Sequence, residues 1–219
     1  MTSDFARLKT VLYSAVLSDT LDALGCTGQV LRPFVRPLDD GLVLMGRART
    51  GGFVPVEAPT PGENPYALEI ALVDDLHEGD VAVLACGGPT ERMGPWGELL
   101  STAARARGAA GCVTDGLVRD VRQIREMSFP VFHGGIGPLD SKGRAKMVTM
   151  DVPVTCGGVT VRPGDIVFGD VDGVVVVPQE LADEVMARAL DKVSGENTVR
   201  TDLEAGASVA ETFRKYGIL

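Results

Sequence analysis

The 219-residue chain is 45% apolar and 5% aromatic, with 27 glycines and 13 prolines, which is typical of a globular α/β protein and excludes a fibrous or disordered one. A chain of this length buries roughly 70% of the surface that its unfolded form exposes, so it can fold without disulfides or a structural metal. Thirty acidic residues against 21 basic ones give a net charge of −9, and the scattered basic residues disfavour nucleic acid as a ligand.

The first third of the chain predicts helix followed by strand. Apolar residues at helical spacing predict a helix over 5–24 that restarts near Ser18-Asp19 and ends at Gly25. A loose alternation over 41–56 then predicts a pair of strands, with Arg47 and Arg49 on one face. We interpret that face as a solvated edge of the sheet.

The middle of the chain predicts two parallel strands joined by a helix. A helix from Pro65 to about Leu76 leads into an apolar strand at 81–84. An alanine-rich helix follows over 98–107, and a second strand follows over 111–114. A strand, crossover helix and strand in this order favour a parallel pair with a right-handed connection. Their carboxyl ends then share one edge of the sheet, and a short helix over 118–126 starts there with Arg119-Asp120.

The last third predicts short strands and then helices. The strands are expected at 130–132, 147–155, 159–161, 166–168 and 173–177. Their spacing indicates a small barrel or sandwich-like sheet and not a second strand–helix–strand series. From Gln179 the chain is helical to its end, with a break at Gly206 and Ser208. The fold class is therefore α/β, as one domain over 1–219 with a helical extension over about 179–219.

The candidate chemistry lies at the shared edge of the two parallel strands. Ligands of open α/β sheets bind at the carboxyl ends of the strands, where Glu98 and Arg119-Asp120 are expected. The first turn of the helix leaves the backbone N–H groups of Glu98, Leu99 and Leu100 without partners inside the helix. These N–H groups suit a carboxylate ligand, and Arg119 can donate two parallel hydrogen bonds to the same carboxylate.

Spacing alone leaves two interpretations of this group open. Glu98 and Asp120 are hard oxygen ligands that suit Mg²⁺ or Mn²⁺, and no histidine cluster indicates zinc. Alternatively, Arg119 and Asp120 form ordinary surface ion pairs, while Glu98 only favours the start of its helix.

Other patterns are weaker indications of a functional site. The Gly-rich stretch 134–137 lacks the full phosphate-binding pattern and is interpreted as a turn. His133 precedes it and is interpreted as a packing or substrate-contacting residue. The segment 170–173 predicts a hairpin turn. Four cysteines lie far apart with no C-x-x-C pair, which favours buried thiols in a reducing compartment. No leader pattern or membrane-spanning stretch is found, so we expect a cytoplasmic protein without a membrane partner.

Several motifs together resemble a known family. The chain is similar to the group that contains the 4-hydroxy-4-methyl-2-oxoglutarate aldolases and the regulator of ribonuclease E activity A, and the resemblance covers nearly the whole length. The motifs that carry it are Ser-Asp-Thr-Leu-Asp at 18–22, Trp-Gly-Glu-Leu-Leu at 96–100, Thr-Asp-Gly-Leu-Val-Arg-Asp at 114–120, Cys-Gly-Gly-Val at 156–159, Pro-Gly-Asp at 163–165, Asp-Gly-Val-Val-Val-Val-Pro at 172–178 and Tyr-Gly at 216–217.

The resemblance implies a fold and a set of site residues. The fold is a mixed sheet of the β/β/α swivelling-domain type. Asp120 would bind Mg²⁺ or Mn²⁺ together with Glu98, and Arg119 would hold a 2-oxo acid whose carboxylate meets the amides of the segment from Gly97 to Leu100, in particular Leu99 and Leu100. The family's aldolases have an acidic residue, twenty intervening residues and then Arg-Asp, a spacing that this chain repeats. They carry Asp where this chain has Glu98, which puts geometry and substrate preference in question.

The resemblance also implies an activity and an assembly. The activity is that of a carbon–carbon lyase, a class II pyruvate aldolase with oxaloacetate decarboxylase side activity. The assembly is a homotrimer or a dimer of trimers, in which a glutamate of the neighbouring subunit completes the site. Glu196 is the candidate for that residue, and we expect it to act with Glu98 on the proton of the substrate's 4-hydroxyl group. The alternative is a non-catalytic binding protein that regulates an RNA-processing enzyme on the same scaffold.

Overall fold

The computed structural model describes residues 5–59 and 61–218. Helices occur at α1 Phe5–Leu8, α2 Ser14–Ala23, α3 Ala67–Asp74, α4 Glu98–Ala106, α5 Val121–Glu126, α6 Ala182–Glu204 and α7 Val209–Tyr216. Strands occur at β1 Arg36–Pro37, β2 Leu44–Pro55, β3 Asp80–Ala85, β4 Gly111–Thr114, β5 Leu117–Val118, β6 Val131–His133, β7 Gly135–Ile136, β8 Ala145–Met150, β9 Val154–Cys156, β10 Val159–Val161, β11 Ile166–Asp170 and β12 Gly173–Val177.

One mixed sheet forms the centre of the molecule. Its strand order is β1-β6-β4-β3-β2-β11-β12, and β8 pairs with the far end of β2. Strands β2, β3, β4 and β6 run parallel, whereas β11 pairs antiparallel with β2 and β12 pairs antiparallel with β11. The predicted parallel pair over 81–84 and 111–114 is therefore confirmed, with Val81 opposite Gly111.

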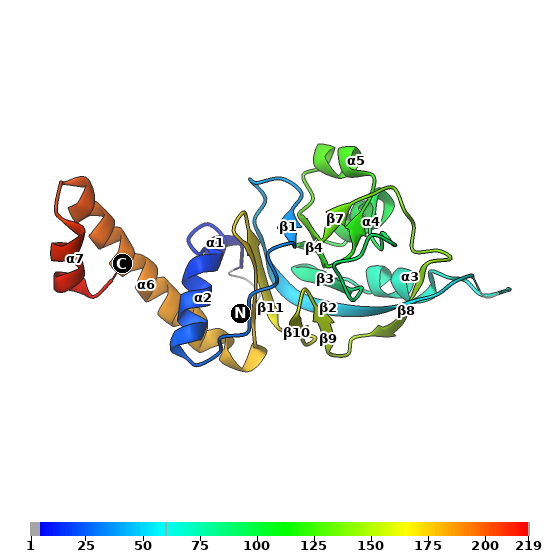
Figure 1. Ribbon diagram of the computed structural model, residues 1–219, viewed down its shortest axis with the longest axis horizontal. Coiled ribbons are helices and arrows are strands. Elements are labelled where there is room, and N and C mark those ends of the chain that lie inside the picture. Colours follow the sequence, from blue (N-terminus) through cyan, green and yellow to red (C-terminus); the bar gives the residue numbers. More distant parts are fainter. Residues whose placement is uncertain (1–4, 60, 219) are drawn as a thin grey trace.

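The late strands form no second strand–helix–strand series within the described residues, as their spacing indicated, and β9 and β10 pair as a hairpin of their own. Strands β8, β11 and β12 extend the same sheet, because the long strand β2 offers both of its edges along its length. Arg36 of β1 donates to the carbonyl oxygen of Asp172, in the turn between β11 and β12, at 2.8 Å. This contact brings the two ends of the strand order together, so the sheet is nearly closed, as Figure 1 shows.

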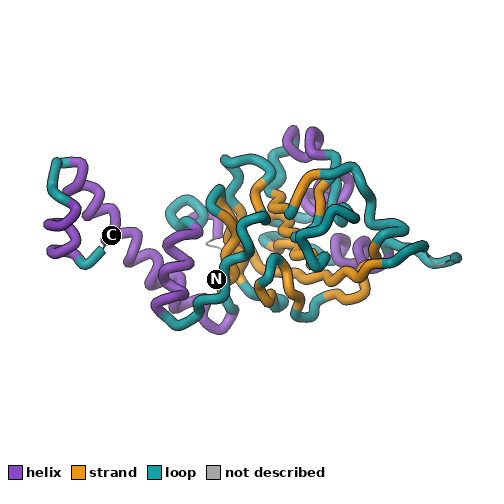
Figure 2. Tube along the Cα trace, viewed as in Figure 1, coloured by secondary structure: helices purple, strands orange, loops and turns teal. Residues whose placement is uncertain are grey.

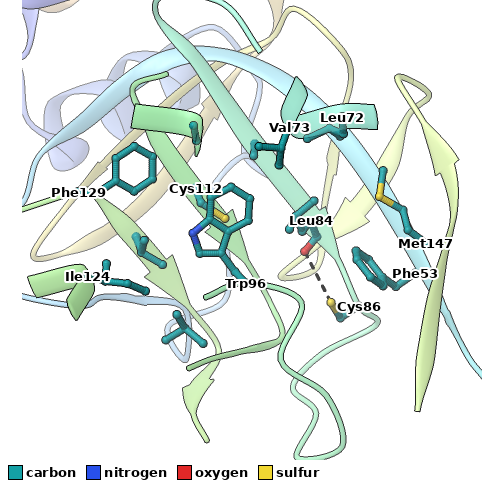
Figure 3. Close-up of a cluster of buried hydrophobic side chains, with 14 of the residues drawn as sticks. Phe53, Leu72, Val73, Leu84, Cys86, Trp96, Cys112, Ile124, Phe129 and Met147 are labelled. Carbon is teal, nitrogen blue, oxygen red and sulfur yellow. Dashed lines mark hydrogen bonds between the residues drawn. The ribbon is translucent and has the colours of Figure 1, made fainter. Parts of the chain in front are cut away.

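Alternating side chains along the strands fill separate apolar layers. Successive residues of a strand point to opposite faces, so Val81 and Val83 pack inside the curved sheet while Ala82 and Leu84 face the helices. Figure 3 shows the layer under the helices, where Trp96 lies at the centre. Helices α3, α4 and α5 cover this layer. Their N-terminal ends therefore lie at the carboxyl edge of the parallel strands.

The C-terminal helices lie on the other side of the sheet. Helices α2 and α6 pack on the outer face of β11 and β12, where Phe168, Val175 and Val185 are buried. Beyond α2, helix α6 projects from the body and α7 folds back along it (Figures 1 and 2). The predicted break is confirmed, because Ser208 caps α7 after Gly206. Within the described ranges, no helix combines the length and apolar character that a membrane span needs.

Two local expectations are wrong. The first helical segment breaks after Leu8 and restarts at Ser14, not at Ser18, since Asp170 accepts hydrogen bonds from the Ser14 amide and hydroxyl groups at 2.8 and 2.7 Å. The segment 41–56 forms one central strand instead of a strand pair at a solvated edge. Arg49 there is only 15% exposed and forms ion pairs with Asp75 and Asp151.

A buried carboxylate fixes the carboxyl edge of the sheet. Asp115 follows β4 and is 2% exposed. Its side chain accepts hydrogen bonds from the amides of Cys86 at 2.6 Å, Gly88 at 2.9 Å and Gly157 at 3.2 Å. The loop after β3, the loop after β4 and the β9–β10 hairpin are therefore tied to one side chain.

Asp115→Asn tests this tie. Asparagine has one acceptor oxygen, so its NH₂ group would face an amide donor that Asp115 now satisfies. We expect the free energy of unfolding to fall by about 3 kcal/mol, as for a buried charge-assisted hydrogen bond that is lost with a donor left unpaired. Urea denaturation measures this free energy of unfolding, with the exposed Asp172→Asn as the control. A loss no larger than that of the control would contradict the assignment.

Candidate functional site

The start of α4 and the segment after β5 lie side by side at the carboxyl edge of the sheet. Trp96 pairs with Val118 in a parallel bridge, and the Arg119 amide donates to the Trp96 carbonyl oxygen at 3.1 Å. The ring of Trp96 is buried among the core side chains. This anchor brings Glu98, Arg119 and Asp120 together, as the topology of the sequence predicted.

Asp120 is held in an unusual backbone conformation that aims its carboxylate at α4. It precedes α5 with a φ of 57°, in the left-handed region. Its Oδ2 accepts a hydrogen bond from the Glu98 amide at 3.2 Å. A Cβ atom on Gly97 would lie 2.7 Å from that oxygen, so only glycine allows the approach. The Glu98 amide, expected to be free for a ligand, is thus used by Asp120.

The guanidinium group of Arg119 lies between two carboxylates. Its Nε is 3.7 Å from Asp120 Oδ2, and its Nη1 is 3.6 Å from Asp140 Oδ2. Both separations are longer than a good hydrogen bond, so the carboxylates hold the group by charge. Its N–H donors therefore remain available to a bound anion.

These groups open onto one cavity of about 340 Å³. Its lining combines the cationic Arg119, the carboxylate of Asp120 and the first turn of α4. In the described chain the amides of Leu99 and Leu100 have no hydrogen-bond partner. The lining residues are Tyr66, Glu69, Ile70, Gly94, Pro95, Trp96, Gly97, Leu99, Leu100, Arg119, Asp120 and Asp140.

The sequence interpretation missed three polar residues of this cavity, namely Tyr66, Glu69 and Asp140. The Tyr66 hydroxyl donates to Asp140 Oδ2 at 2.5 Å. Burial and this bond raise the pKa of Tyr66 to about 12. Although burial opposes ionisation of Asp140, the bond from Tyr66 and the charge of Arg119 lower its pKa. Asp140 is therefore an anion that links Arg119 to α3.

Glu69 is the most buried acidic side chain of the cavity. It is 6% exposed, and its Oε1 accepts a hydrogen bond from the Ser141 hydroxyl at 2.9 Å. Burial raises the pKa of Glu69 to about 7, against the effect of that bond. A signal for Glu69 was present in the sequence: it lies three, four and seven residues before Leu72, Val73 and Leu76, on the apolar face of the predicted helix.

The two glutamates that the sequence predicted, Glu98 and Glu196, do not line this cavity. The Glu98 carboxylate accepts a hydrogen bond from the Thr102 hydroxyl at 2.8 Å, along its own helix, and does not line the cavity. Glu196 is on α6, where it accepts a hydrogen bond from Tyr13 and forms an ion pair with Lys192 at 3.6 Å. Figure 1 shows that α6 lies on the opposite side of the sheet from α4. Their catalytic roles stay predictions.

Asp120 fits one kind of metal site. The described residues contain no group of three or more His, Cys, Asp or Glu side chains that could hold a metal. Mg²⁺, however, keeps several waters and is commonly held by one or two carboxylates together with substrate oxygens. The Asp120 side chain is 44% exposed at the cavity, and its Oδ1 has no hydrogen-bond partner in the described chain. It suits Mg²⁺ or Mn²⁺ and not a fully protein-bound zinc ion.

The weaker sequence candidates are structural. The segment after His133 pairs with β5, and a Cβ atom on Gly134 would lie 2.4 Å from the Asp115 carbonyl oxygen. Burial lowers the pKa of His133 to about 4, so this residue is neutral at pH 7. The hairpin turn at 170–173 is confirmed. Burial raises the pKa values of the thiols of Cys86, Cys112 and Cys156, which keeps them protonated.

The raised pKa of Glu69 predicts a pH-dependent stability. Between the ordinary value of 4.5 and the folded value of about 7, the folded state binds more protons at Glu69 than the unfolded state does. The free energy of unfolding therefore falls as pH rises through this range, by up to about 3 kcal/mol. Glu69→Gln cannot titrate, so it should be more stable than the parent at pH 8 and similar to it at pH 4.5.

Urea denaturation at both pH values checks this, with the exposed Glu180→Gln as a control. The same stability difference between Glu69→Gln and the parent at the two pH values would refute the raised pKa.

Comparison with known proteins places the chain in a family. The family model described as RraA-like, Aldolase/RraA, matches residues 14–176. The match includes the whole cavity and ends before α6, so Glu196 lies outside it. A Halalkalibacterium halodurans protein named "Putative 4-hydroxy-4-methyl-2-oxoglutarate aldolase" is 33% identical over 189 residues, which cover 86% of this chain and 83% of that protein.

Two further proteins are similar over most of the chain. Protein DlpA of Legionella pneumophila is 32% identical over 93% of this chain, which spans only 32% of the length of that protein. The crystal structure of Streptomyces coelicolor RraAS2, described as an unusual member of the RNase ES inhibitor RraA protein family, is 31% identical with a TM-score of 0.77, over 89% of this chain and 96% of that one. This chain belongs to the RraA-like family, whose model is described as Aldolase/RraA.

Proposed function

We propose that the protein is a divalent-metal-dependent pyruvate aldolase. It cleaves a 4-hydroxy-2-oxo acid, such as 4-hydroxy-4-methyl-2-oxoglutarate, to pyruvate and a second carbonyl compound. The observation that carries this proposal is the convergence of Arg119, Asp120 and the free amides of α4 on one cavity. An ordinary surface ion pair does not require an aspartate held in the left-handed backbone region, or an arginine whose N–H donors remain available to a ligand.

The side chains and the backbone amides bind different parts of the substrate. The amides of Leu99 and Leu100 bind the substrate carboxylate at the positive end of α4. Arg119 donates to the keto oxygen, where negative charge develops as the bond between C3 and C4 breaks. Mg²⁺ or Mn²⁺ held by Asp120 would supply further electrophilic stabilisation of that charge. The same charge develops when oxaloacetate loses carbon dioxide, so this decarboxylation is a side activity.

The proton of the 4-hydroxyl group needs an acceptor. We assign this role to Glu98 together with Glu196 of a neighbouring copy in a homotrimer or dimer of trimers. Helix α6 lies across the sheet from α4 (Figure 1), so Glu196 is remote from the α4 end of the cavity in its own copy, which supports a contribution from another copy. Glu98 would have to turn from Thr102 toward the substrate to take part.

Asp120→Asn tests the metal role. The variant keeps the size of the side chain and loses its charge, so we expect kcat/KM for pyruvate release to fall by about 100-fold or more. Pyruvate release from a panel of 4-hydroxy-2-oxo acids with Mg²⁺ or Mn²⁺, before and after EDTA, is the measurement. The exposed Asp172→Asn is the control. Full, EDTA-sensitive activity in Asp120→Asn would refute the assignment.

Gly97→Ala tests the approach of Asp120 to α4. The new methyl group would meet Asp120 and Arg119, so both side chains have to shift. A shift of about 1 Å at reacting groups costs on the order of 100-fold in rate. We expect kcat to fall by about that factor. In the control, Gly28→Ala, the methyl group meets no atom within 4 Å, and its activity should stay at the parent level. Equal activities of the two variants would contradict the geometry.

The similarity to the Streptomyces protein supports a second candidate function. On this alternative, the chain is a non-catalytic protein-binding regulator of an RNA-processing enzyme. Thermal unfolding with Mg²⁺ plus pyruvate or oxalate separates the two, because a ligand that binds only the folded state raises Tm. A rise in Tm that Asp120→Asn abolishes supports the aldolase. The absence of both a rise and pyruvate release supports the regulator.

A further inference from the structure

The proposed cleavage requires two proton transfers, one at the 4-hydroxyl group and one at C3. The 4-hydroxyl group loses a proton, for which Glu98 and Glu196 are the proposed acceptors. When the bond between C3 and C4 breaks, its electron pair stays with C3 and is delocalised onto the keto oxygen as an enolate. C3 must then gain a proton before pyruvate forms. A side chain that carries a proton near neutral pH is suited to this second transfer.

Glu69 is the lining side chain that can supply this proton. Asp120, as the proposed metal ligand, binds a cation only when it is ionised. Asp140 is an anion because, against the effect of burial, the Tyr66 hydroxyl and the charge of Arg119 lower its pKa. Tyr66 has a pKa of about 12, and its proton is already donated to Asp140. Glu69, with a pKa of about 7, has both its acid and its carboxylate form near neutral pH.

The surroundings of Glu69 explain why it keeps a proton. Burial is the main cause of its raised pKa, and the negative charge of Asp140 raises the pKa further. The Ser141 hydroxyl and the positive charge of Arg119 lower it. After β3, burial raises the pKa of the Cys86 thiol, so this neighbour stays neutral. The charges that act on Glu69 are thus one fixed anion and one fixed cation.

Two consecutive residues link Glu69 to Arg119. Asp140 Oδ2 lies 3.6 Å from Arg119 Nη1, and the next residue, Ser141, donates to Glu69 Oε1 at 2.9 Å. The second oxygen of Glu69, Oε2, has no hydrogen-bond partner in the described chain and is not among its fully buried, unpartnered atoms. Because Glu69 lines the same cavity as Arg119, this oxygen can meet a ligand there.

We propose that Glu69 is the acid that protonates C3 of the enolate after the bond between C3 and C4 has broken. This proposal rests on the proposed function and adds a catalytic residue to it. The Glu69 carboxyl group gives its proton to C3, the enolate electron pair forms the new C–H bond, and the keto group on C2 is restored. Glu69 is left as a carboxylate and regains a proton from water. C3 is bonded to the keto carbon whose oxygen meets Arg119, so a carboxyl group linked to Arg119 in the same cavity is suitably placed.

Exchange of the methyl protons of pyruvate with solvent tests this step on its own. By microscopic reversibility, the group that protonates C3 also removes a proton from the methyl group of bound pyruvate, so pyruvate in D₂O with Mg²⁺ gains deuterium at C3. Proton NMR measures the rate. We expect Glu69→Gln to lower this rate by about 100-fold or more, as is typical when a general acid or base is removed. The exposed Glu180→Gln should match the parent.

Ligand binding distinguishes a loss of proton transfer from a damaged cavity. Oxalate resembles the pyruvate enolate but has no carbon that takes a proton. We expect oxalate with Mg²⁺ to raise the Tm of Glu69→Gln by at least as much as it raises that of the parent. Loss of both exchange and oxalate binding in Glu69→Gln would overturn the proposal, and so would exchange at the rate of the parent.

The pH dependence of the exchange identifies the group that titrates. Exchange begins with the carboxylate form, so the rate of the parent should rise with pH as Glu69 ionises. A cation held by Asp120 favours this ionisation, so the midpoint should lie at or below about 7. The residual exchange of Glu69→Gln should lack the rise. The same pH dependence in Glu69→Gln as in the parent would assign the titration to another group and contradict the proposal.

Cleavage of 4-hydroxy-4-methyl-2-oxoglutarate separates this proposal from the proposed function. We expect kcat of Glu69→Gln to fall while KM changes little, because Glu69 acts on C3 only after the substrate is bound. A parent that cleaves the substrate, together with a Glu69→Gln variant that keeps its kcat and its exchange rate, refutes the role of Glu69 and leaves the proposed function standing. A parent that neither cleaves the substrate nor exchanges pyruvate refutes both.

Discussion

The carboxylate of Asp115 is the contact on which the geometry of the site depends. Three backbone amides donate to it from the loop after β3 and from the β9–β10 hairpin. The segment that follows Asp115 runs through β5 to Arg119 and Asp120, and the β7 segment packs on its backbone. A carboxylate that is buried and fully hydrogen-bonded is costly to disturb, so it sets where this segment leaves the sheet.

Beyond β5, the close approach of two backbone segments, and not side-chain packing, fixes the geometry of the site. Gly97 allows Asp120 to reach the first amide of α4, and the left-handed conformation of Asp120 directs the carboxylate there. Arg119 is then held by charge between Asp120 and Asp140 without good hydrogen bonds. The site thus combines a rigid backbone with an arginine whose donors are open, the arrangement that binding of a small anion requires.

The cavity also explains why Glu69 on α3 and the nearby Asp140 matter for a site built at α4. Asp140 joins the two ends of the lining, because it faces Arg119 and accepts the bond from Tyr66. Glu69 adds a second acidic group whose pKa burial raises to about 7. Its charge therefore changes near neutral pH, and the stability of the fold depends on that charge.

The parallel strands over 81–84 and 111–114, the crossover helix and the approach of Glu98 to Arg119-Asp120 could be predicted from the sequence, because a short strand–helix–strand segment favours a parallel pair whose carboxyl ends share one edge. The sequence by itself did not determine that β11 and β12 join the same sheet, or that Arg49 lies in a central strand, since pairing partners depend on distant segments. Only the tertiary structure placed Tyr66, Glu69 and Asp140 beside Arg119 and turned the Glu98 carboxylate toward Thr102. These contacts depend on how α3 packs across the sheet, which no spacing within one segment records.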